Sequence, residues 1–164
     1  MSLRDDLTRH LPGRVAVIGV GNLMRGDDAV GSLIARELIG SIDAEVLVAE
    51  DVPESIIGTV VSGHPDLVVL IDAVDFGASP GSAALLTRGD LTRLLPTPHH
   101  IPLPLLMEFL EDEGRSTVVL VAVQPRQLEF GAEVSDDVAQ CAEALVQILR
   151  EVFSVSKRGI PCCR

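Results

Sequence analysis

Strand and helix patterns alternate along this chain. Short apolar runs rich in Val, Ile and Leu predict strands buried on both faces of a sheet, and apolar residues three or four positions apart predict amphipathic helices. Because the two patterns alternate, we expect an α/β fold with an open, mostly parallel sheet covered by helices on both faces. The predicted strands cover residues 14–21, 45–49, 66–72, 82–87 and 116–123, and the predicted helices cover residues 27–40, 53–62, 105–113 and 134–152.

The predicted elements belong to a single domain. The chain has 164 residues without an internal repeat or a convincing linker, and this length suits one hydrophobic core. We expect the core within residues 14–152, strand 82–87 at an edge of the sheet, and a C-terminal tail over residues 155–164. The proline-rich stretch 96–104, which contains His99, is expected to be a loop.

Composition and charge narrow the classes of function. Hydrophobic residues make up 47% of the chain and aromatic residues only 2%, so aliphatic side chains must fill the core. The net charge of −11 disfavours nucleic acids and anionic membranes as partners, because both are bound through Lys and Arg. No apolar run reaches the roughly 20 residues of a membrane-spanning helix. The polar, charged start does not resemble a signal peptide, so we expect a cytoplasmic protein.

The cysteines do not suggest a disulfide framework. There are three of them, and two are adjacent near the end of the chain. Cys141 lies on the apolar stripe of a predicted helix, so we expect it to be a small buried hydrophobe. Cys162 and Cys163 have the chemistry to bind a metal, but their position favours a frayed tail.

The first predicted strand runs into a glycine loop that ends in two acidic residues. A dinucleotide-binding motif requires a third glycine where Met24 stands, and a phosphate loop requires Lys and Ser or Thr where Asp27 and Asp28 stand. Two carboxylates at the start of a helix would also repel a phosphate group. The loop therefore does not predict a nucleotide site.

Polar side chains stand where the predicted strands reach the carboxyl edge of the sheet. Asp27 and Asp28 follow the first strand, Asp72 ends the third strand, and His99 lies in the loop before a helix. Taken singly, the aspartates suit caps and turns, and the histidine suits a solvated loop. Taken together, two carboxylates and an imidazole are ligands for a divalent metal, and three ligands leave coordination positions open for chemistry.

Four segments resemble motifs of the hydrogenase maturation proteases. Residues 19–31 resemble the N-terminal signature of that family, in which a Gly-x-Gly-Asn run precedes acidic residues and a later glycine. Residues 67–75 resemble the second motif, an apolar strand ending in Asp-Ala, and residues 97–103 resemble the third, a loop histidine before a helix. Residues 122–125 are similar to a Gln-Pro turn after the last core strand. The resemblance spans about residues 14–152.

Within this family the chain looks closest to the branch that serves hydrogenase 3. Three features carry this resemblance, namely the Asp27-Asp28 pair, the dipeptide at residues 53–54, and the His-x-x-Pro-Leu loop at residues 99–103. The resemblance implies a twisted five-stranded sheet between helices, which is a three-layer α/β/α fold. Ala29 departs from the glycine of many members, and alanine is tolerable at the start of a helix.

The resemblance also implies an activity and a site. The family contains endopeptidases of the aspartyl type that remove a C-terminal extension from the large-subunit precursor of a nickel–iron hydrogenase. Asp28, Asp72 and His99 match the metal ligands and catalytic residues of the family, and His100 is a neighbouring alternative to His99. Asp27 would then cap the helix or line the rim of the site, because adjacent helical side chains diverge by about 100°. Nickel already inserted in the precursor would be the recognition element, and other divalent ions could occupy the site.

The sequence leaves two other functions open. One is a nickel checkpoint or chaperone that holds the precursor without cutting it. The other is a different metallopeptidase that uses a tightly bound zinc ion. A shortened product from nickel-loaded precursor would distinguish the protease from the checkpoint, and cleavage of unrelated peptides by a zinc-loaded protein would favour the other metallopeptidase.

Overall fold

The computed structural model describes most of the chain in four segments. These segments are residues 3–9, 13–50, 52–94 and 103–154, without the side chains of Pro53 and Glu54. The predictions that lie outside the described residues concern the loop with His99 and His100 and the tail with Cys162 and Cys163.

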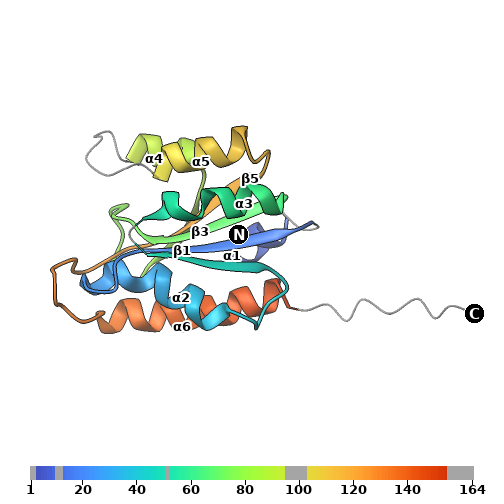
Figure 1. Cartoon of the computed structure of the whole chain (residues 1–164). Coiled ribbons are helices and arrows are strands. Elements are labelled where there is room, and N and C mark those ends of the chain that lie inside the picture. The colour runs from blue at the N-terminus through green and yellow to red at the C-terminus, as the bar shows by residue number, and fades with distance from the viewer. Residues whose placement is uncertain (1–2, 10–12, 51, 95–102, 155–164) are drawn as a thin grey trace, which may run out of the picture.

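The described residues form a five-stranded sheet between two layers of helices (Figure 1). The strands are β1 (Val15–Val20), β2 (Glu45–Glu50), β3 (Leu67–Ala73), β4 (Ala83–Leu86) and β5 (Thr117–Val123). The α-helices are α1 (Leu3–Thr8), α2 (Val30–Leu38), α3 (Ile57–Gly63), α4 (Arg88–Leu94), α5 (Leu103–Asp112) and α6 (Asp136–Val152). Two 3₁₀ turns, η1 (Gly26–Ala29) and η2 (Pro53–Ile56), precede α2 and α3.

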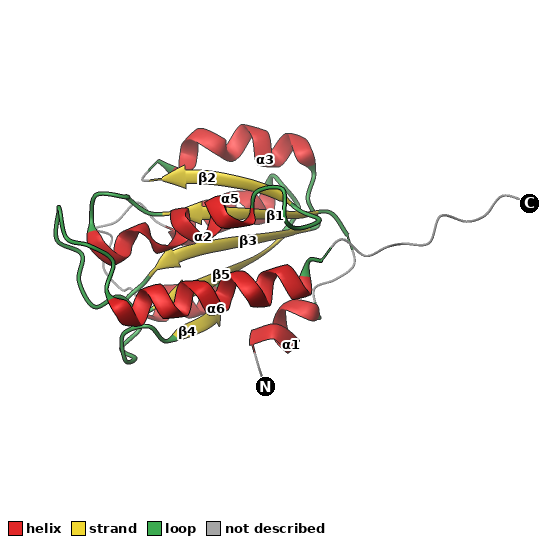
Figure 2. Ribbon diagram, turned by 90° about the horizontal axis from the view of Figure 1, so that it is seen from below, coloured by secondary structure: helices red, strands yellow, loops and turns green. Residues whose placement is uncertain are grey.

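The order of the strands is β2–β1–β3–β5–β4, and all neighbours are parallel except the pair β4 and β5. Helices α2 and α6 cover one face of the sheet, and α3, α4 and α5 cover the other (Figures 1 and 2). The predicted three-layer α/β/α fold is therefore confirmed, and so is the edge position of the fourth strand. Among the described residues, no helix is long and apolar enough to cross a membrane.

The apolar runs form the central strands because both faces of these strands are covered. Along β3, Val69 and Ile71 pack into the core beneath α2 and α6, whereas Val68 and Leu70 pack into the core beneath α3 and α5. This alternation follows from the two-residue period of a strand. Cys141 was expected to be buried and is half-buried beside the first of these cores, where burial raises the pKa of its thiol.

Helices α1 and α4 have no counterpart among the predicted elements. The first packs the fully buried Leu7 into the core on the α2–α6 face of the sheet. The second begins after Thr87, whose backbone N–H and hydroxyl both donate to the carboxylate of Asp90. The backbone N–H of Asp90 donates in return to the hydroxyl of Thr87, at 3.3 Å. This reciprocal arrangement is a capping box, and the spacing Thr-x-x-Asp is the sequence signal that could have predicted α4.

The carboxyl ends of strands β1 and β3 lie side by side at one edge of the sheet. Helix α2 leads from β1 to β2 on one face, and α3 leads from β2 to β3 on the opposite face. Strands β1 and β3 are nevertheless hydrogen-bonded neighbours, so the connecting helices change face at this pair of strands. In open α/β sheets ligands bind at such a switch point, and this is where the two predicted acidic ligands stand.

Candidate functional site

Glycines allow helix α2 to approach the ends of β1 and β3 very closely. A Cβ atom on Gly31 would lie 2.0 Å from the carbonyl oxygen of Ile71 and 2.2 Å from that of Val20. A Cβ on Gly21, where φ is +130°, would lie 1.7 Å from the carbonyl oxygen of Asp28. The glycines of the first motif therefore serve backbone packing, and this packing brings the turn before α2 to the end of β3.

Replacing Gly31 with alanine should destabilise the protein by about 2–3 kcal/mol, because both atoms that the new methyl group meets are backbone oxygens. Urea unfolding would measure the loss. The matched control is Gly58→Ala in α3, where an added Cβ meets nothing within 4 Å. That variant should gain roughly 0.5–1 kcal/mol from higher helix propensity. Equal stability of the two variants would refute the close approach.

Asp28 is held by the loop that precedes it. It lies in the turn η1, half-buried, and its Oδ2 atom accepts a hydrogen bond of 2.9 Å from the backbone N–H of Asn22. The Oδ1 atom of Asn22 accepts in turn from the N–H of Met24, at 2.8 Å. The glycine loop thus folds around the carboxylate, and it provides no cradle for a phosphate group.

Asp72 stands at the end of the central strand β3 beside this turn. Its Oδ1 atom accepts a hydrogen bond of 2.8 Å from the N–H of Ala73. Burial, together with the negative charge of Asp28, raises the pKa of Asp72 from 3.8 to about 8. The hydrogen bond from Ala73 opposes this shift and is too weak to cancel it. At neutral pH the site therefore favours a proton or another positive charge between its acids.

The structure thus brings together two of the three residues predicted to form the site. Asp28 and Asp72 interact electrostatically, whereas His99 lies outside the described residues, and the roles of all three stay predictions. Among the described residues, no group of three His, Cys, Asp or Glu side chains is arranged to hold a metal ion. The two acids are a hard, incomplete ligand set that fits a divalent ion shared with another molecule.

Asp27 neither caps its own helix nor lines the rim, so that prediction was wrong. Its side chain is completely buried, and η1 has no side-chain cap. The carboxylate accepts four hydrogen bonds from the loop between β5 and α6. The donors are the backbone N–H groups of Arg126 (2.7 Å), Gln127 (3.0 Å) and Ser135 (2.7 Å) and the hydroxyl of Ser135 (2.9 Å).

The charge of Asp27 is stabilised where it lies. Burial alone would raise its pKa, but the hydrogen bonds from Ser135, Arg126 and Gln127 outweigh burial and lower the pKa below 3.8. Ser135 is also the residue that precedes α6, so the carboxylate sits at the positive end of that helix. Asp27 therefore joins two loops through its buried carboxylate. Because this carboxylate binds the loop before α6, Asp28 is the residue of the pair that remains for the site.

Gln124 fixes the loop that follows Asp72. Its Oε1 atom accepts hydrogen bonds from the N–H groups of Phe76 (2.9 Å) and Ala78 (3.1 Å), and its Nε2 donates to Asp75 at 3.0 Å. The hydrogen bonds from Gln124 and from Gly77 lower the pKa of Asp75. The predicted Gln-Pro turn thus has a structural purpose, because its glutamine organises the connection after β3.

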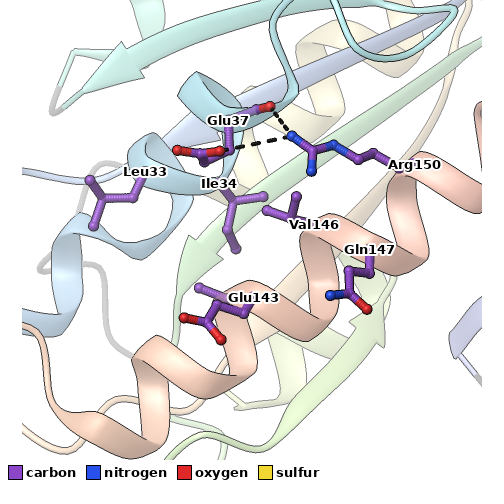
Figure 3. Close-up of a pocket in the computed structure, with 8 residues that line it drawn as sticks. Leu33, Ile34, Glu37, Glu143, Val146, Gln147 and Arg150 are labelled. Carbon is purple, nitrogen blue, oxygen red and sulfur yellow. Dashed lines mark hydrogen bonds and ion pairs between the residues drawn. The ribbon is translucent and has the colours of Figure 1, made fainter.

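A pocket of about 400 Å³ lies elsewhere, between α2 and α6 (Figure 3). Its walls include Leu33, Ile34 and Val146, and Arg150 crosses it to donate a hydrogen bond of 2.8 Å to the carbonyl oxygen of Glu37. None of the aspartates at the carboxyl edge lines this pocket. We therefore place the candidate site at the sheet edge, where the acids meet.

Solved structures resemble this fold closely. The crystal structure of the [NiFe] hydrogenase maturation protease HycI from Thermococcus kodakarensis KOD1 matches with a TM-score of 0.82 and 30% identity, over 93% of this chain and 99% of that chain. The solution structure of the endopeptidase HycI from Escherichia coli matches with a TM-score of 0.76 and 25% identity, over 84% of this chain and 90% of that chain.

Sequence comparisons agree with the structural ones. The hydrogenase 3 maturation protease of Escherichia coli strain K12 is 28% identical over 134 residues, which cover 79% of this chain and 85% of that protein. The family model described as hydrogenase maturation protease (HycI) matches residues 36–152. The predicted branch, that of the hydrogenase 3 proteases, is thereby confirmed. The chain belongs to the hydrogenase maturation protease family and is a peptidase of hydrogenase maturation.

Proposed function

We propose that this protein is a cytoplasmic endopeptidase that removes the C-terminal extension of a nickel–iron hydrogenase large-subunit precursor after nickel insertion. Membership of the family supports a protease role in hydrogenase maturation. The finer statement, that nickel carried by the substrate is the recognition element, rests on the pairing of Asp28 with Asp72. This pairing is the single observation that carries the proposal.

The two acids are suited to an ion that arrives with the substrate. The neighbouring carboxylates repel each other, and a divalent cation would relieve this repulsion. Two carboxylates and one imidazole provide no soft ligand, so affinity for free nickel should be modest. Cysteine thiolates of the precursor would provide soft ligands, and docking would complete the coordination sphere. Nickel polarises a peptide carbonyl or activates water, which is the chemistry that hydrolysis needs.

His99 is the third ligand in this proposal. The two-residue alternation along β3 puts Asp72 on the same face of the sheet as Leu70, which is the face covered by α5. His99 precedes α5 by a short stretch of chain, and α5 begins at Leu103. Asp72 therefore lies on the face of the sheet that is covered by the helix following His99. The assignment remains a proposal, and His99→Ala compared with His100→Ala tests it directly.

The proposed nickel gate predicts that only nickel-loaded precursor is trimmed. Purified protein is mixed with precursor prepared with and without nickel, in a chelator too weak to strip the assembled centre. The shortened product is measured by mass spectrometry. We expect trimming of the loaded precursor and less than about a hundredth of that rate without nickel, because the shared ion supplies several kcal/mol of stabilisation.

The same experiment separates the alternatives. Equal trimming of both precursors would contradict nickel recognition and would leave the peptide sequence of the extension as the signal. Tight binding of loaded precursor without any shortened product would contradict the peptidase and favour a checkpoint. Titration calorimetry of the isolated protein with nickel should show weak binding, and a submicromolar dissociation constant would contradict a substrate-borne ion.

A further inference from the structure

Three large apolar side chains are exposed on the two loops that Asp27 joins. Met24, in the loop before η1, is 57% exposed, and Leu128 and Phe130, in the loop between β5 and α6, are 40% and 76% exposed. We call these three residues the loop patch. The loop between β5 and α6 extends beyond the carboxyl edge of the sheet, beside the turn into α2 (Figure 1). Exposed apolar residues grouped at a site commonly mark a binding surface.

Hydrogen bonds hold the two loops together. The N–H of Gly131 donates to the carbonyl oxygen of Met24 at 2.7 Å, and the side chain of Arg25 donates to the carbonyl oxygen of Leu128 at 3.3 Å. Two further bonds join Gly26 to Ala132 (3.2 Å) and Asp27 to Gln127 (3.0 Å). The loop patch is therefore presented on a fixed backbone, which reduces the entropy that a partner must overcome on binding.

The loop patch is also continuous with the acids of the site. Asn22 donates its backbone N–H to Asp28 and accepts the N–H of Met24 through its side chain. The hydrogen bonds of a single residue, Asn22, thus connect the candidate ligand Asp28 with Met24, the first member of the loop patch. A substrate whose nickel reaches Asp28 therefore comes close to the loop that carries Met24.

The surroundings of the loop patch carry a negative charge. The exposed acids on the second loop and at the start of α6 are Glu129, Glu133, Asp136 and Asp137, whereas the exposed arginines are Arg25 and Arg126. Four acids against two arginines leave a local charge of −2, and Arg126 is already paired with Asp137. The whole chain carries −11. The complementary surface is therefore apolar with a basic rim.

We propose that the loop patch is the docking site for an apolar, basic-rimmed surface of the large-subunit precursor close to its C-terminal extension. This inference rests on the proposed function and adds a second recognition element to it. The nickel ion reports that the precursor is loaded, and the loop patch selects the protein that carries the ion. Specificity then comes from a surface outside the reacting atoms.

The test compares two exposed apolar residues replaced in the same way. Met24→Gln changes the loop patch, and Ile39→Gln changes a side chain of nearly equal exposure, 58%, beyond the far end of α2. We expect Met24→Gln and Phe130→Gln each to raise the KM for nickel-loaded precursor about fivefold or more, with kcat unchanged. The control Ile39→Gln should leave KM within about twofold, and thermal unfolding should confirm that all three variants are folded.

Binding is measured separately from cleavage in an Asp28→Asn background, which prevents trimming on the sensor. Addition of Phe130→Gln should weaken binding of the precursor about fivefold or more, and Glu129→Lys with Glu133→Lys should slow association and reverse its salt dependence. Unchanged KM and unchanged binding in the loop-patch variants would overturn the inference. If the wild-type protein trims no precursor, the proposed function fails, and the binding measurement still decides on the loop patch.

Discussion

Asp72→Asn should give a protein that is more stable than the wild type and no longer trims its precursor. In the folded protein Asp72 is half-buried, and desolvation together with the negative charge of Asp28 raises its pKa to about 8. An amide of the same size removes this unfavourable charge, so we expect a gain of about 1–2 kcal/mol at pH 8. Processing should fall by about 10²–10⁴-fold, because the proposed site loses a titratable carboxyl group that would bind the ion carried by the substrate.

The gain in stability should depend on pH in a definite direction. The unfolded chain releases the proton of Asp72 near pH 3.8, whereas the folded protein keeps it until about pH 8. The folded state thus binds more protons between these values, and the free energy of unfolding of the wild type falls as the pH rises through this window. Asp72→Asn lacks this dependence, so the two proteins should be equally stable near pH 4 and differ most near pH 8.

Urea unfolding at pH 4, 6 and 8 measures this difference. Asp112→Asn is the control, because Asp112 is exposed at the end of α5 and its replacement should change stability by less than about 0.5 kcal/mol. A loss of stability in Asp72→Asn at pH 8 would show that the carboxylate is stabilised where it lies. Full processing activity in that variant would remove Asp72 from the site.

The adjacent aspartates should separate stability from activity. Asp27→Ala leaves three part-buried backbone N–H groups without their acceptor, so we expect a loss of about 3–5 kcal/mol and poor folding. Asp28→Ala removes a half-buried side chain that accepts a bond from Asn22, and it should lose about 1 kcal/mol. Asp28→Asn should keep the fold and still abolish processing, because it removes the charge alone.

Acid titration provides an independent check on Asp27. Its pKa is lowered in the folded state, so its contribution to stability is present above pH 3.8 and disappears as the pH falls through the lower folded value. The difference between the wild type and Asp27→Ala should therefore shrink in strong acid. If Asp27→Ala folds normally but does not cut, while Asp28→Ala cuts, the assignment of the two residues is reversed.

Much of the sheet could be predicted from the sequence because its central strands are buried on both faces. An uninterrupted apolar run such as residues 67–71 reports that environment directly. The short helices α1 and α4 escaped prediction because each buries only one apolar residue completely, Leu7 in α1 and Leu91 in α4. Their signals are a leucine pair and a capping box, which are weaker than a long periodic stripe.

The acids of the site could be placed from the sequence because they end neighbouring strands. Asp28 and Asp72 follow β1 and β3, and the switch-point rule directs attention to that edge. The role of Asp27 could not be predicted, because its partners lie 99 to 108 residues further along the chain. The loop patch also escaped prediction, since exposure of Phe130 depends on how two distant loops meet.

The long span of chain that Asp27 bridges affects the order in which parts of the protein can fold during synthesis. Asp28 emerges early from the ribosome. The four groups that donate hydrogen bonds to the neighbouring Asp27 emerge only with residues 126–135. Until then the carboxylate of Asp27 lacks its hydrogen-bond donors, and closing so long a loop is entropically costly. A ribosome-bound fragment that stops before Ser135 should therefore hold strands but no competent edge. We expect the enzyme to become able to cut only after residues 126–135 have been made and have met Asp27.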